Sequence, residues 1–232
     1  PALCTTPVEI DGAVSRVLEF LTKFPSAPIS IDLEGRLGGS RPKIDLLQLH
    51  IDAPDKDHHA ITFVIDTLAS KGYALRQTGA SSIRSILENK QVFKVLHCCH
   101  GDASSLFVQY GIKLSGAFDT GIGDALLAGH SSNRGLSKVL RTYLSEEEAA
   151  LTHKGSLVHV PELFAERPLP YNLFVYAYED VTACNKLFWS QRRLLEERNL
   201  FELACALTDK RCPPLSLPPS ASTSPGPRPT PR

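Results

Sequence analysis

The pattern of apolar residues near the start of the chain predicts a helix. Hydrophobic side chains recur there at three- and four-residue intervals, the spacing of one helix face: Val14, Val17, Leu18, Leu21 and Phe24. Asp11 is the expected N-cap of this helix. Pro25 and Pro28 should end it, because proline has no amide hydrogen to donate to the preceding turn.

Three apolar runs follow this helix and predict strands at 29–35, 44–51 and 60–68. The first two runs are separated by RLGGSRPK, a glycine- and proline-containing turn of hairpin length, so we expect them to pair antiparallel. Side chains alternate along a strand. In the first run, one face should therefore carry Ile29, Ile31 and Leu33, and the other Asp32 and Glu34.

From about residue 81 the pattern alternates between helices and strands. Helical spacing is found at 81–90, 102–110, 123–129, 135–144 and about 170–200, and strand-like runs at 92–99 and 117–120. An antiparallel start followed by alternating strands and helices predicts an α/β fold. We expect a mixed sheet, with antiparallel first strands and then parallel strands, covered by helices on its faces.

Composition divides the chain into a body and a tail. With 42% hydrophobic residues in 232, residues 1–208 can bury the core of one domain. Residues 209–232 are rich in proline, serine and threonine and predict a disordered tail. The formal net charge is zero, but the tail is basic and the body is therefore acidic. A nucleic-acid partner would have to be held by local groups or by bound cations.

The cysteines and the lack of a long apolar run indicate the cellular compartment in which we expect the protein. Six cysteines without a Cys-x-x-Cys pair resemble neither a disulfide framework nor a zinc ribbon, so we expect an intracellular, reducing compartment, the nucleus or cytoplasm. No run approaches the roughly 20 apolar residues that a membrane-spanning helix needs, so no membrane partner is expected. The chain has no methionine and begins with proline, which suggests a fragment and leaves an organelle open.

Three stretches carry acidic residues at informative positions. Asp32 and Glu34 lie side by side on one strand face, Asp102 follows a strand and opens a helix, and Tyr176 precedes Asp180 by one helical turn. Each stretch has an ordinary structural explanation. Asp32 and Glu34 could form the solvated face of an edge strand, and Asp102 could be a helix-capping acid. Tyr176 and Asp180 could belong to the polar side of an amphipathic helix.

The run from His97 to His100, with Cys98 and Cys99 between the histidines, also suggests zinc ligands. Strand alternation sends neighbouring side chains to opposite faces, however, and no second cluster of ligands lies nearby in sequence. A zinc site is therefore the less favoured interpretation.

Taken together, the acidic stretches resemble the motifs of the DEDDy branch of 3′–5′ exonucleases, which includes ribonuclease D and the Werner syndrome exonuclease domain. Comparable segments include KVLH before Asp102, FDT at 118–120, RGLSKVLRTYL at 134–144 and RPL at 167–169. The amino-acid sequence of these segments is most similar to the Egalitarian-like and exonuclease 3′–5′ domain-containing subgroup. The resemblance covers roughly residues 8–200 and implies a ribonuclease H-like mixed sheet.

The resemblance also implies chemistry. Asp32, Glu34, Asp102 and Asp180 would hold two Mg²⁺ or Mn²⁺ ions, which prefer oxygen ligands. Asp32 would bridge both ions, Glu34 would lie near the terminal 3′ hydroxyl, and Tyr176 would orient the attacking water. The implied reaction is hydrolysis of the terminal phosphodiester bond of RNA or DNA, with release of nucleoside 5′-monophosphates.

Two functions remain open from the sequence. The first is an active exonuclease whose partner is single-stranded or 3′-ended nucleic acid. The second is a catalytically weak module with the exonuclease fold that binds RNA or a protein, because a fold by itself does not determine activity. The presence of all five expected residues favours the first function. The sequence identifies no protein partner, and it does not separate RNA from DNA as the substrate.

Overall fold

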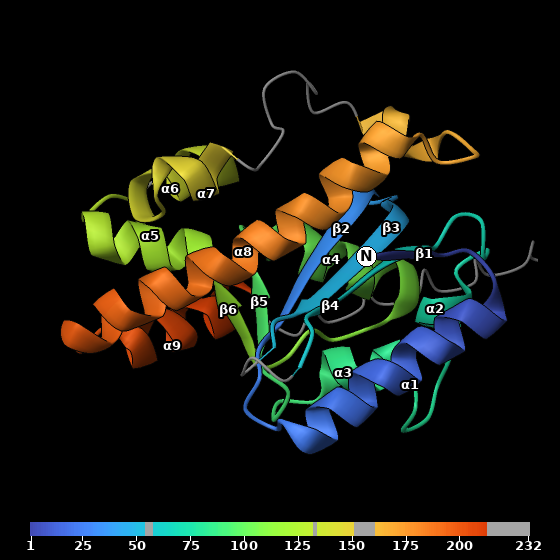
Figure 1. The fold of residues 1–232 in the computed structure, drawn as a ribbon, viewed down its shortest axis with the longest axis horizontal. Coiled ribbons are helices and arrows are strands. Elements are labelled where there is room, and N and C mark those ends of the chain that lie inside the picture. The colour runs from blue at the N-terminus through green and yellow to red at the C-terminus, as the bar shows by residue number, and fades with distance from the viewer. Residues whose placement is uncertain (54–57, 132–133, 151–160, 213–232) are drawn as a thin grey trace, which may run out of the picture.

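A mixed sheet forms the centre of the described part of the chain (Figure 1). The structure is a computed structural model that describes residues 1–53, 58–131, 134–150 and 161–212. Within these ranges the sheet has the strand order β1-β4-β3-β2-β5-β6. The strands are β1 (Ala2–Cys4), β2 (Ile29–Arg36), β3 (Lys43–Ile51), β4 (Ile61–Asp66), β5 (Lys94–Leu96) and β6 (Ala117–Asp119).

The direction of the strands changes along the sheet as the sequence predicts. Strands β2, β3 and β4 are antiparallel neighbours, with Asp32 opposite Gln48, whereas β5 and β6 run parallel to β2. Strand β1 pairs in parallel with β4 at the other edge. The apolar pattern did not predict β1, because a strand of three residues is too short to display a period.

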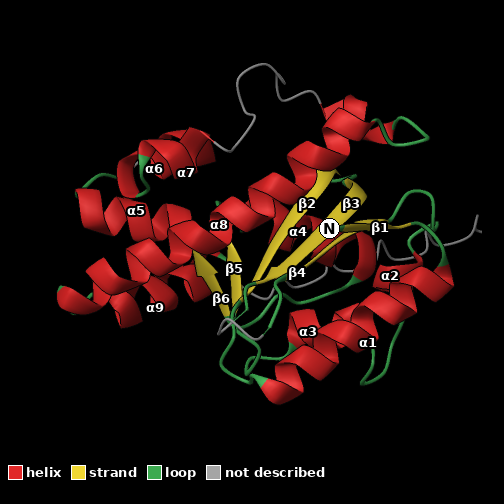
Figure 2. Cartoon of the chain, viewed as in Figure 1, coloured by secondary structure: helices red, strands yellow, loops and turns green. Residues whose placement is uncertain are grey.

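Helices cover both faces of this sheet (Figure 2). They are α1 (Pro7–Lys23), α2 (Tyr73–Arg76), α3 (Ile83–Glu88), α4 (His100–Tyr110), α5 (Thr120–Ala128), α6 (Leu136–Tyr143), α7 (Glu146–Ala150), the 3-10 helix η1 (Pro161–Ala165), α8 (Tyr171–Glu197) and α9 (Phe201–Arg211). The sequence predicted the helices that carry clear periodicity. It did not predict α2, α7, η1 or α9. Within the described part of the chain, none of the helices has the length and apolar character needed to cross a membrane.

The core lies on both sides of the sheet. Ile29, Ile31 and Leu33 pack with residues of α1, α3 and α4 on one face, as the alternation in the sequence predicts. On the other face, Leu46 and Val64 pack against α8. Helix α8 therefore lies against the face of β2 from which Asp32 and Glu34 project.

The beginning of α1 differs from the prediction. Thr6, and not Asp11, is the N-cap, because Thr6 and Glu9 form a capping box in which each side chain accepts a hydrogen bond from the other residue's amide. Pro7 occupies the first helical turn, where its missing amide hydrogen costs nothing. Asp11 lies inside the helix and accepts a hydrogen bond from the Tyr73 hydroxyl at 3.0 Å.

The C-terminal end of the described chain extends past the predicted domain boundary. Thr208 is fully buried inside α9, and its hydroxyl accepts a hydrogen bond from the Asp119 amide at 3.1 Å. Beyond the helix, Cys212 is buried and forms a disulfide with Cys99, a pairing that the cysteine spacing did not suggest. Residues 213–232 lie outside the described residues, so the disorder of the tail stays a prediction.

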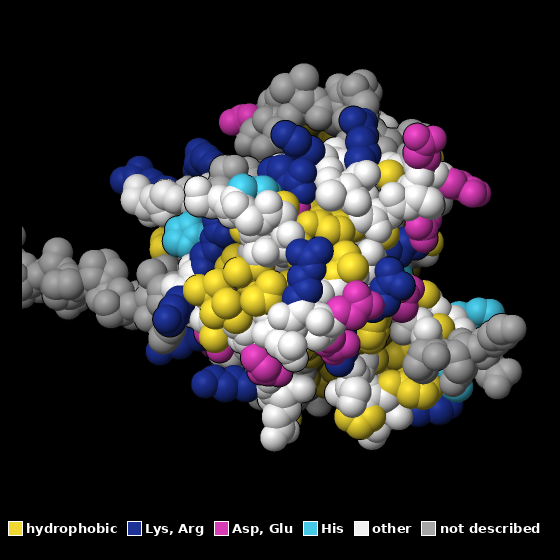
Figure 3. Space-filling model, turned by 90° about the vertical axis from the view of Figure 1, so that its left-hand side faces the viewer, with side chains coloured by type: hydrophobic (Ala, Val, Ile, Leu, Met, Phe, Trp, Pro, Cys, Tyr) yellow, Lys and Arg dark blue, Asp and Glu magenta, His cyan; other side chains and the backbone are white. Residues whose placement is uncertain are grey.

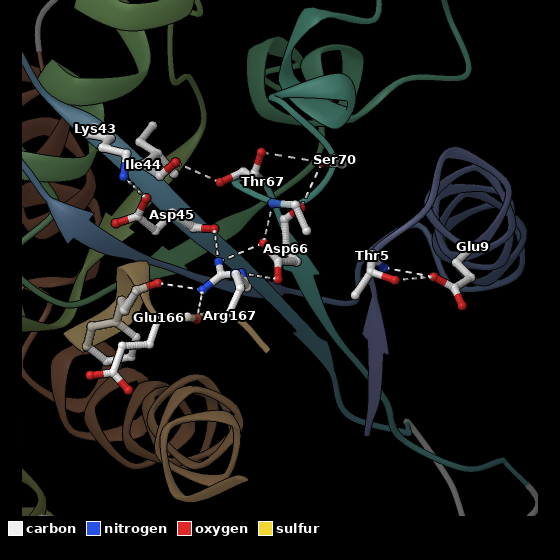
Figure 4. A network of polar contacts seen from close by, with 12 residues as sticks. Thr5, Glu9, Lys43, Ile44, Asp45, Asp66, Thr67, Ser70, Glu166 and Arg167 are labelled. Carbon is white, nitrogen blue, oxygen red and sulfur yellow. Dashed lines mark hydrogen bonds and ion pairs between the residues drawn. The ribbon is translucent and has the colours of Figure 1, made fainter. Parts of the chain in front are cut away.

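Arg167 fixes the segment that leads into α8 (Figure 4). Its Nη2 donates a hydrogen bond to Asp66 Oδ1 at 2.7 Å, and its Nε lies 2.6 Å from Asp66 Oδ2. The same guanidinium donates to the Asp45 carbonyl at 3.3 Å and to the Phe164 carbonyl at 2.8 Å. Because Asp66 is fully buried at the end of β4, this pair anchors α8 to the sheet.

Replacing Arg167 with alanine should lower the free energy of unfolding by about 3 kcal/mol, because it leaves the buried Asp66 carboxylate without its cation. Urea denaturation followed by circular dichroism measures this loss. The matched control is Arg141→Ala on α6. Arg141 is exposed and makes no ion pair with any described residue, so we expect a change below about 0.5 kcal/mol. Equal losses in the two variants would contradict the anchoring role of Arg167.

Candidate active site

All five side chains singled out in the sequence line one cleft. They come from three elements: Asp32 and Glu34 from β2, Asp102 from the first turn of α4, and Tyr176 and Asp180 from α8. The cleft has a volume of about 700 Å³, and we call it the acidic cleft. Residues distant in the chain therefore meet at one place, as the motifs predicted.

The end of β2 is shaped around Glu34. The pairing register between β2 and β3 shifts between Glu34 and Gly35. Gly35 has a φ of 132°, and a Cβ atom added there would lie 2.3 Å from the Lys43 carbonyl oxygen. Only glycine fits this close approach of the two strands. The irregularity directly follows the two acids, so it belongs to the local backbone that presents them.

Three carboxylates converge on one point of the cleft. Oxygen atoms of Asp32, Glu34 and Asp180 all lie within 4.8 Å of one another. Glu34 and Asp180 are buried, at 4% and 5% exposure, so water does not screen their charges as it does at the surface. No other group of three or more His, Cys, Asp or Glu side chains in the described ranges is close enough to share an ion.

Asp102 lies beside this group and has an unsatisfied oxygen. The residue is 5% exposed, and its Oδ1 is buried without a hydrogen-bond partner among the described residues. Burial raises the pKa of this carboxyl well above its usual value, and the negative charge of Asp32 raises it further. A buried acid with a free oxygen, facing three other acids, fits a site that holds divalent cations.

The turn before Asp102 is held by Asp119, at the end of β6. The Asp119 carboxylate accepts hydrogen bonds from the amides of Cys98 at 2.7 Å and Cys99 at 3.2 Å. It also accepts from Gly121 at 2.8 Å, which makes it the N-cap of α5. Cys98 has a φ of 59°, a left-handed conformation that this support stabilises. The FDT motif therefore helps to aim Asp102 into the acidic cleft, a role that sequence reasoning did not assign.

Tyr176 and Asp180 lie one turn apart on α8 and interact through their side chains. Burial raises the pKa of the Tyr176 hydroxyl strongly. The charges of Asp180, Glu34 and Asp32 and a hydrogen bond with Asp180 raise it further. The ring of Tyr176 packs against Phe164, with a centroid distance of 5.9 Å. The hydroxyl therefore keeps its proton at neutral pH and can act as a hydrogen-bond donor inside the cleft.

A basic wall faces the carboxylates, and sequence reasoning did not identify it as part of the site. Arg134 and Lys138, beside and within α6, line the cleft. Arg134 Nε donates to the buried Asp124 at 2.7 Å, and the Arg134 carbonyl accepts a hydrogen bond from His97 Nε2 at 2.9 Å. The basic residues of the RGLSKVLRTYL segment, its first, fifth and eighth residues, are the sequence feature that could have indicated this wall. The cleft thus combines acids that suit metal ions with cations that suit phosphate.

The zinc interpretation of residues 97–100 does not agree with their contacts. His97 Nδ1 lies 2.8 Å from the Thr120 hydroxyl oxygen, and His100 Nδ1 lies 3.1 Å from the Arg211 carbonyl oxygen. Cys99 is bonded to Cys212. These side chains therefore have separate partners, and in the described part of the chain they form no shared ligand group.

Comparison with known proteins relates this chain to 3′–5′ exonucleases. A family model described as 3′–5′ exonuclease matches residues 6–196. Among curated proteins, the mouse piRNA biogenesis protein EXD1 is 28% identical over 107 residues, which span 40% of this chain and 18% of that protein. The match therefore covers less than a fifth of the curated relative.

Solved structures of ribonuclease D have folds similar to the fold of this chain. Trypanosoma brucei RNase D in complex with GMP superposes with a TM-score of 0.66 at 20% identity, covering 91% of this chain and 62% of that one. Escherichia coli RNase D gives a TM-score of 0.64 at 20% identity, with 91% and 49% covered. At this identity the likeness establishes the fold, and the mixed sheet flanked by helices agrees with the predicted ribonuclease H-like class. Because the family model spans most of the chain, the protein belongs to the 3′–5′ exonuclease family.

Proposed function

We propose that the chain hydrolyses the terminal phosphodiester bond at the 3′ end of RNA or DNA and releases nucleoside 5′-monophosphates. The observation that carries this proposal is the convergence of four carboxylates and one tyrosine in the acidic cleft. Membership of the 3′–5′ exonuclease family supports it. The similarity to E. coli RNase D, described as an exoribonuclease involved in structured RNA processing, supports it further.

The donor set fits two Mg²⁺ or Mn²⁺ ions, since all four acids offer oxygen. Asp32, Glu34 and Asp180 would hold one ion between them, and Asp102 would contribute, with Asp32, to holding the second. When bound, such ions neutralise the acids, activate water and stabilise the departing oxygen. In the free protein the four acids repel each other, so affinity for divalent cations follows from their placement.

Tyr176 has the position and protonation state to orient a water molecule. Its raised pKa keeps the hydroxyl protonated. The hydroxyl donates this proton to Asp180, which holds its oxygen next to the carboxylates as an acceptor for a water molecule. A group that orients the attacking water contributes to the rate without contributing charge to the ion site. We assign Tyr176 this positioning role.

The substrate is expected to enter past Arg134 and Lys138, because the acidic body as a whole does not attract nucleic acid. A structure of T. brucei RNase D in complex with the RNA U12, which aligns with a TM-score of 0.66, supports RNA as a bound form. RNA and DNA both remain within the proposal. Discrimination between them requires contacts to the 2′ hydroxyl.

The alternative is a module with this fold that binds RNA or a protein with negligible turnover. The similarity to a piRNA biogenesis protein is compatible with such a role. Binding alone does not require four carboxylates and a tyrosine in one cleft, where their repulsion costs stability. Hydrolysis explains this arrangement better.

A direct assay incubates the protein with a 5′-labelled single-stranded oligonucleotide and Mn²⁺. We expect a ladder of products shortened from the 3′ end, and no ladder with EDTA or with Asp32→Asn, because both remove the ions that the reaction needs. Gel electrophoresis resolves the ladder. Tight binding without any shortening would support the binding module instead.

Tyr176→Phe should lower kcat by about 100-fold, because it removes the hydroxyl that orients the water. It should leave Mn²⁺ binding unchanged, because the hydroxyl carries no charge at neutral pH. Single-turnover kinetics measure the rate, and isothermal titration calorimetry measures ion affinity. A loss of ion affinity as large as that of Asp32→Asn would show that Tyr176 serves the ion site itself.

Asp102→Asn should stabilise the ion-free protein on the order of 1 kcal/mol at neutral pH. The pKa of Asp102 is raised in the folded state, so the folded protein holds this proton more tightly than the unfolded chain does. The stability of the wild type is therefore full below the ordinary pKa of an aspartate, and it falls as the pH rises through the raised pKa. Thermal unfolding in EDTA, in acid and in neutral buffer, measures the difference, which should vanish in acid.

With Mn²⁺ present the order should reverse, because ion binding stabilises the wild type more than the variant. An Asp102→Asn protein less stable than wild type in neutral EDTA would contradict the raised pKa.

A further inference from the structure

A second hollow lies between α5 and α9, outside the acidic cleft. We call it the α5–α9 hollow. Its volume is about 500 Å³, within the range of small-molecule sites. Its apolar floor includes Ile122 and Leu126 from α5 and Leu207 from α9, and its rim carries the basic side chains His130, Lys210 and Arg211.

The hollow and the acidic cleft share a wall built around two fully buried carboxylates. Asp124 binds Arg134 of the cleft, and its Oδ2 lies 3.1 Å from Nε2 of His130 in the hollow. Asp119 accepts from the Cys98 amide on the cleft side and lies 3.6 Å from Arg211 on the hollow side. The two sites are therefore direct neighbours.

The rim of the hollow retains positive charge after these contacts. His130 lies against Asp124, and Arg211 pairs with Asp119. Lys210, by contrast, is exposed and makes no ion pair with the described residues. Two of the last carbonyls of α9 are already hydrogen-bonded, those of Thr208 at 2.9 Å and Arg211 at 3.1 Å. The partial negative charge of the helix end is thereby reduced.

The surrounding surface has the same character. On the face that includes α5, α6 and α9, an apolar patch is bordered by Lys and Arg side chains, and acidic side chains border it as well, below and to the right in this view (Figure 3). A base can pack on an apolar floor while its phosphate meets a basic rim, which is the usual arrangement for single-stranded nucleic acid.

We infer that the α5–α9 hollow binds a nucleotide of a single strand whose 3′ end occupies the acidic cleft. The inference rests on the proposed function for the position of that 3′ end. The base would pack on Leu126 and Leu207, and the phosphate would contact Lys210. Because Asp124 contacts both Arg134 of the cleft and His130 of the hollow, the two sites lie close enough for one strand to reach both.

The test measures binding of a fluorescent single-stranded oligouridylate of about 20 nucleotides in EDTA, over a range of salt concentrations. One phosphate contact contributes about 0.7 to the slope of log affinity against log salt for a single strand, so Lys210→Gln should reduce that slope by about 0.7. Lys210→Glu should weaken binding further. The matched control is Lys90→Gln, an exposed lysine between α3 and β5, which should leave the slope unchanged.

Each outcome bears on the inference. Unchanged binding of the long strand by Lys210→Gln would overturn it, as would an equal effect of Lys90→Gln. If Lys210→Gln binds the strand as the wild type does but binds polyglutamate more weakly, the hollow is a site for an acidic protein partner. That result would also overturn the inference. Because the assay needs no hydrolysis, a wild-type protein that binds the strand but never shortens it refutes the proposed function and leaves this result intact.

Discussion

The placement of four mutually repelling carboxylates in one cleft is the constraint that the rest of this structure has to satisfy. Oxygen atoms of Asp32, Glu34 and Asp180 lie within 4.8 Å of one another, and Asp102 lies close enough for Asp32 to raise its pKa. Such an arrangement opposes folding in the absence of cations. It persists only because the surrounding structure fixes each of the elements that carry the acids.

The anchors of the cleft are themselves buried acids, and the contrast with Asp102 is informative. Asp66 is neutralised by Arg167 and holds the segment before α8. Asp124 is neutralised by Arg134 and holds the wall beside α6. Asp119 accepts backbone amides and holds the turn before α4. Each anchoring acid has its partner within the chain, whereas Asp102 keeps a buried oxygen without one among the described residues. An external cation is the partner that this difference implies.

Local sequence predicted much of the fold, because the periodic elements are long enough to display a pattern. Strand alternation placed Ile31 in the core and Asp32 opposite, and helical spacing placed Tyr176 beside Asp180. It did not predict β1 or η1, because elements this short carry no period. The cap of α1 was assigned to Asp11, because the apolar spacing was followed only from Val14 onward, whereas the helix begins at Pro7.

The five residues of the candidate site were identified from the order and separation of the motifs, since each stretch alone had an ordinary explanation. Their supports were not identified, because support is a tertiary property. Asp119 reaches the amides of Cys98 and Cys99 only once β6 lies beside β5. Arg167 reaches Asp66 only once η1 packs against β2 and β3. No spacing along the chain encodes either contact.

The most direct test of this account is anomalous X-ray diffraction from a crystal of the protein soaked with Mn²⁺. The account predicts a strong anomalous peak bounded by Asp32, Glu34 and Asp180, and a second one beside Asp102. A map without a peak in the acidic cleft, at Mn²⁺ concentrations that saturate other sites in the crystal, would contradict it.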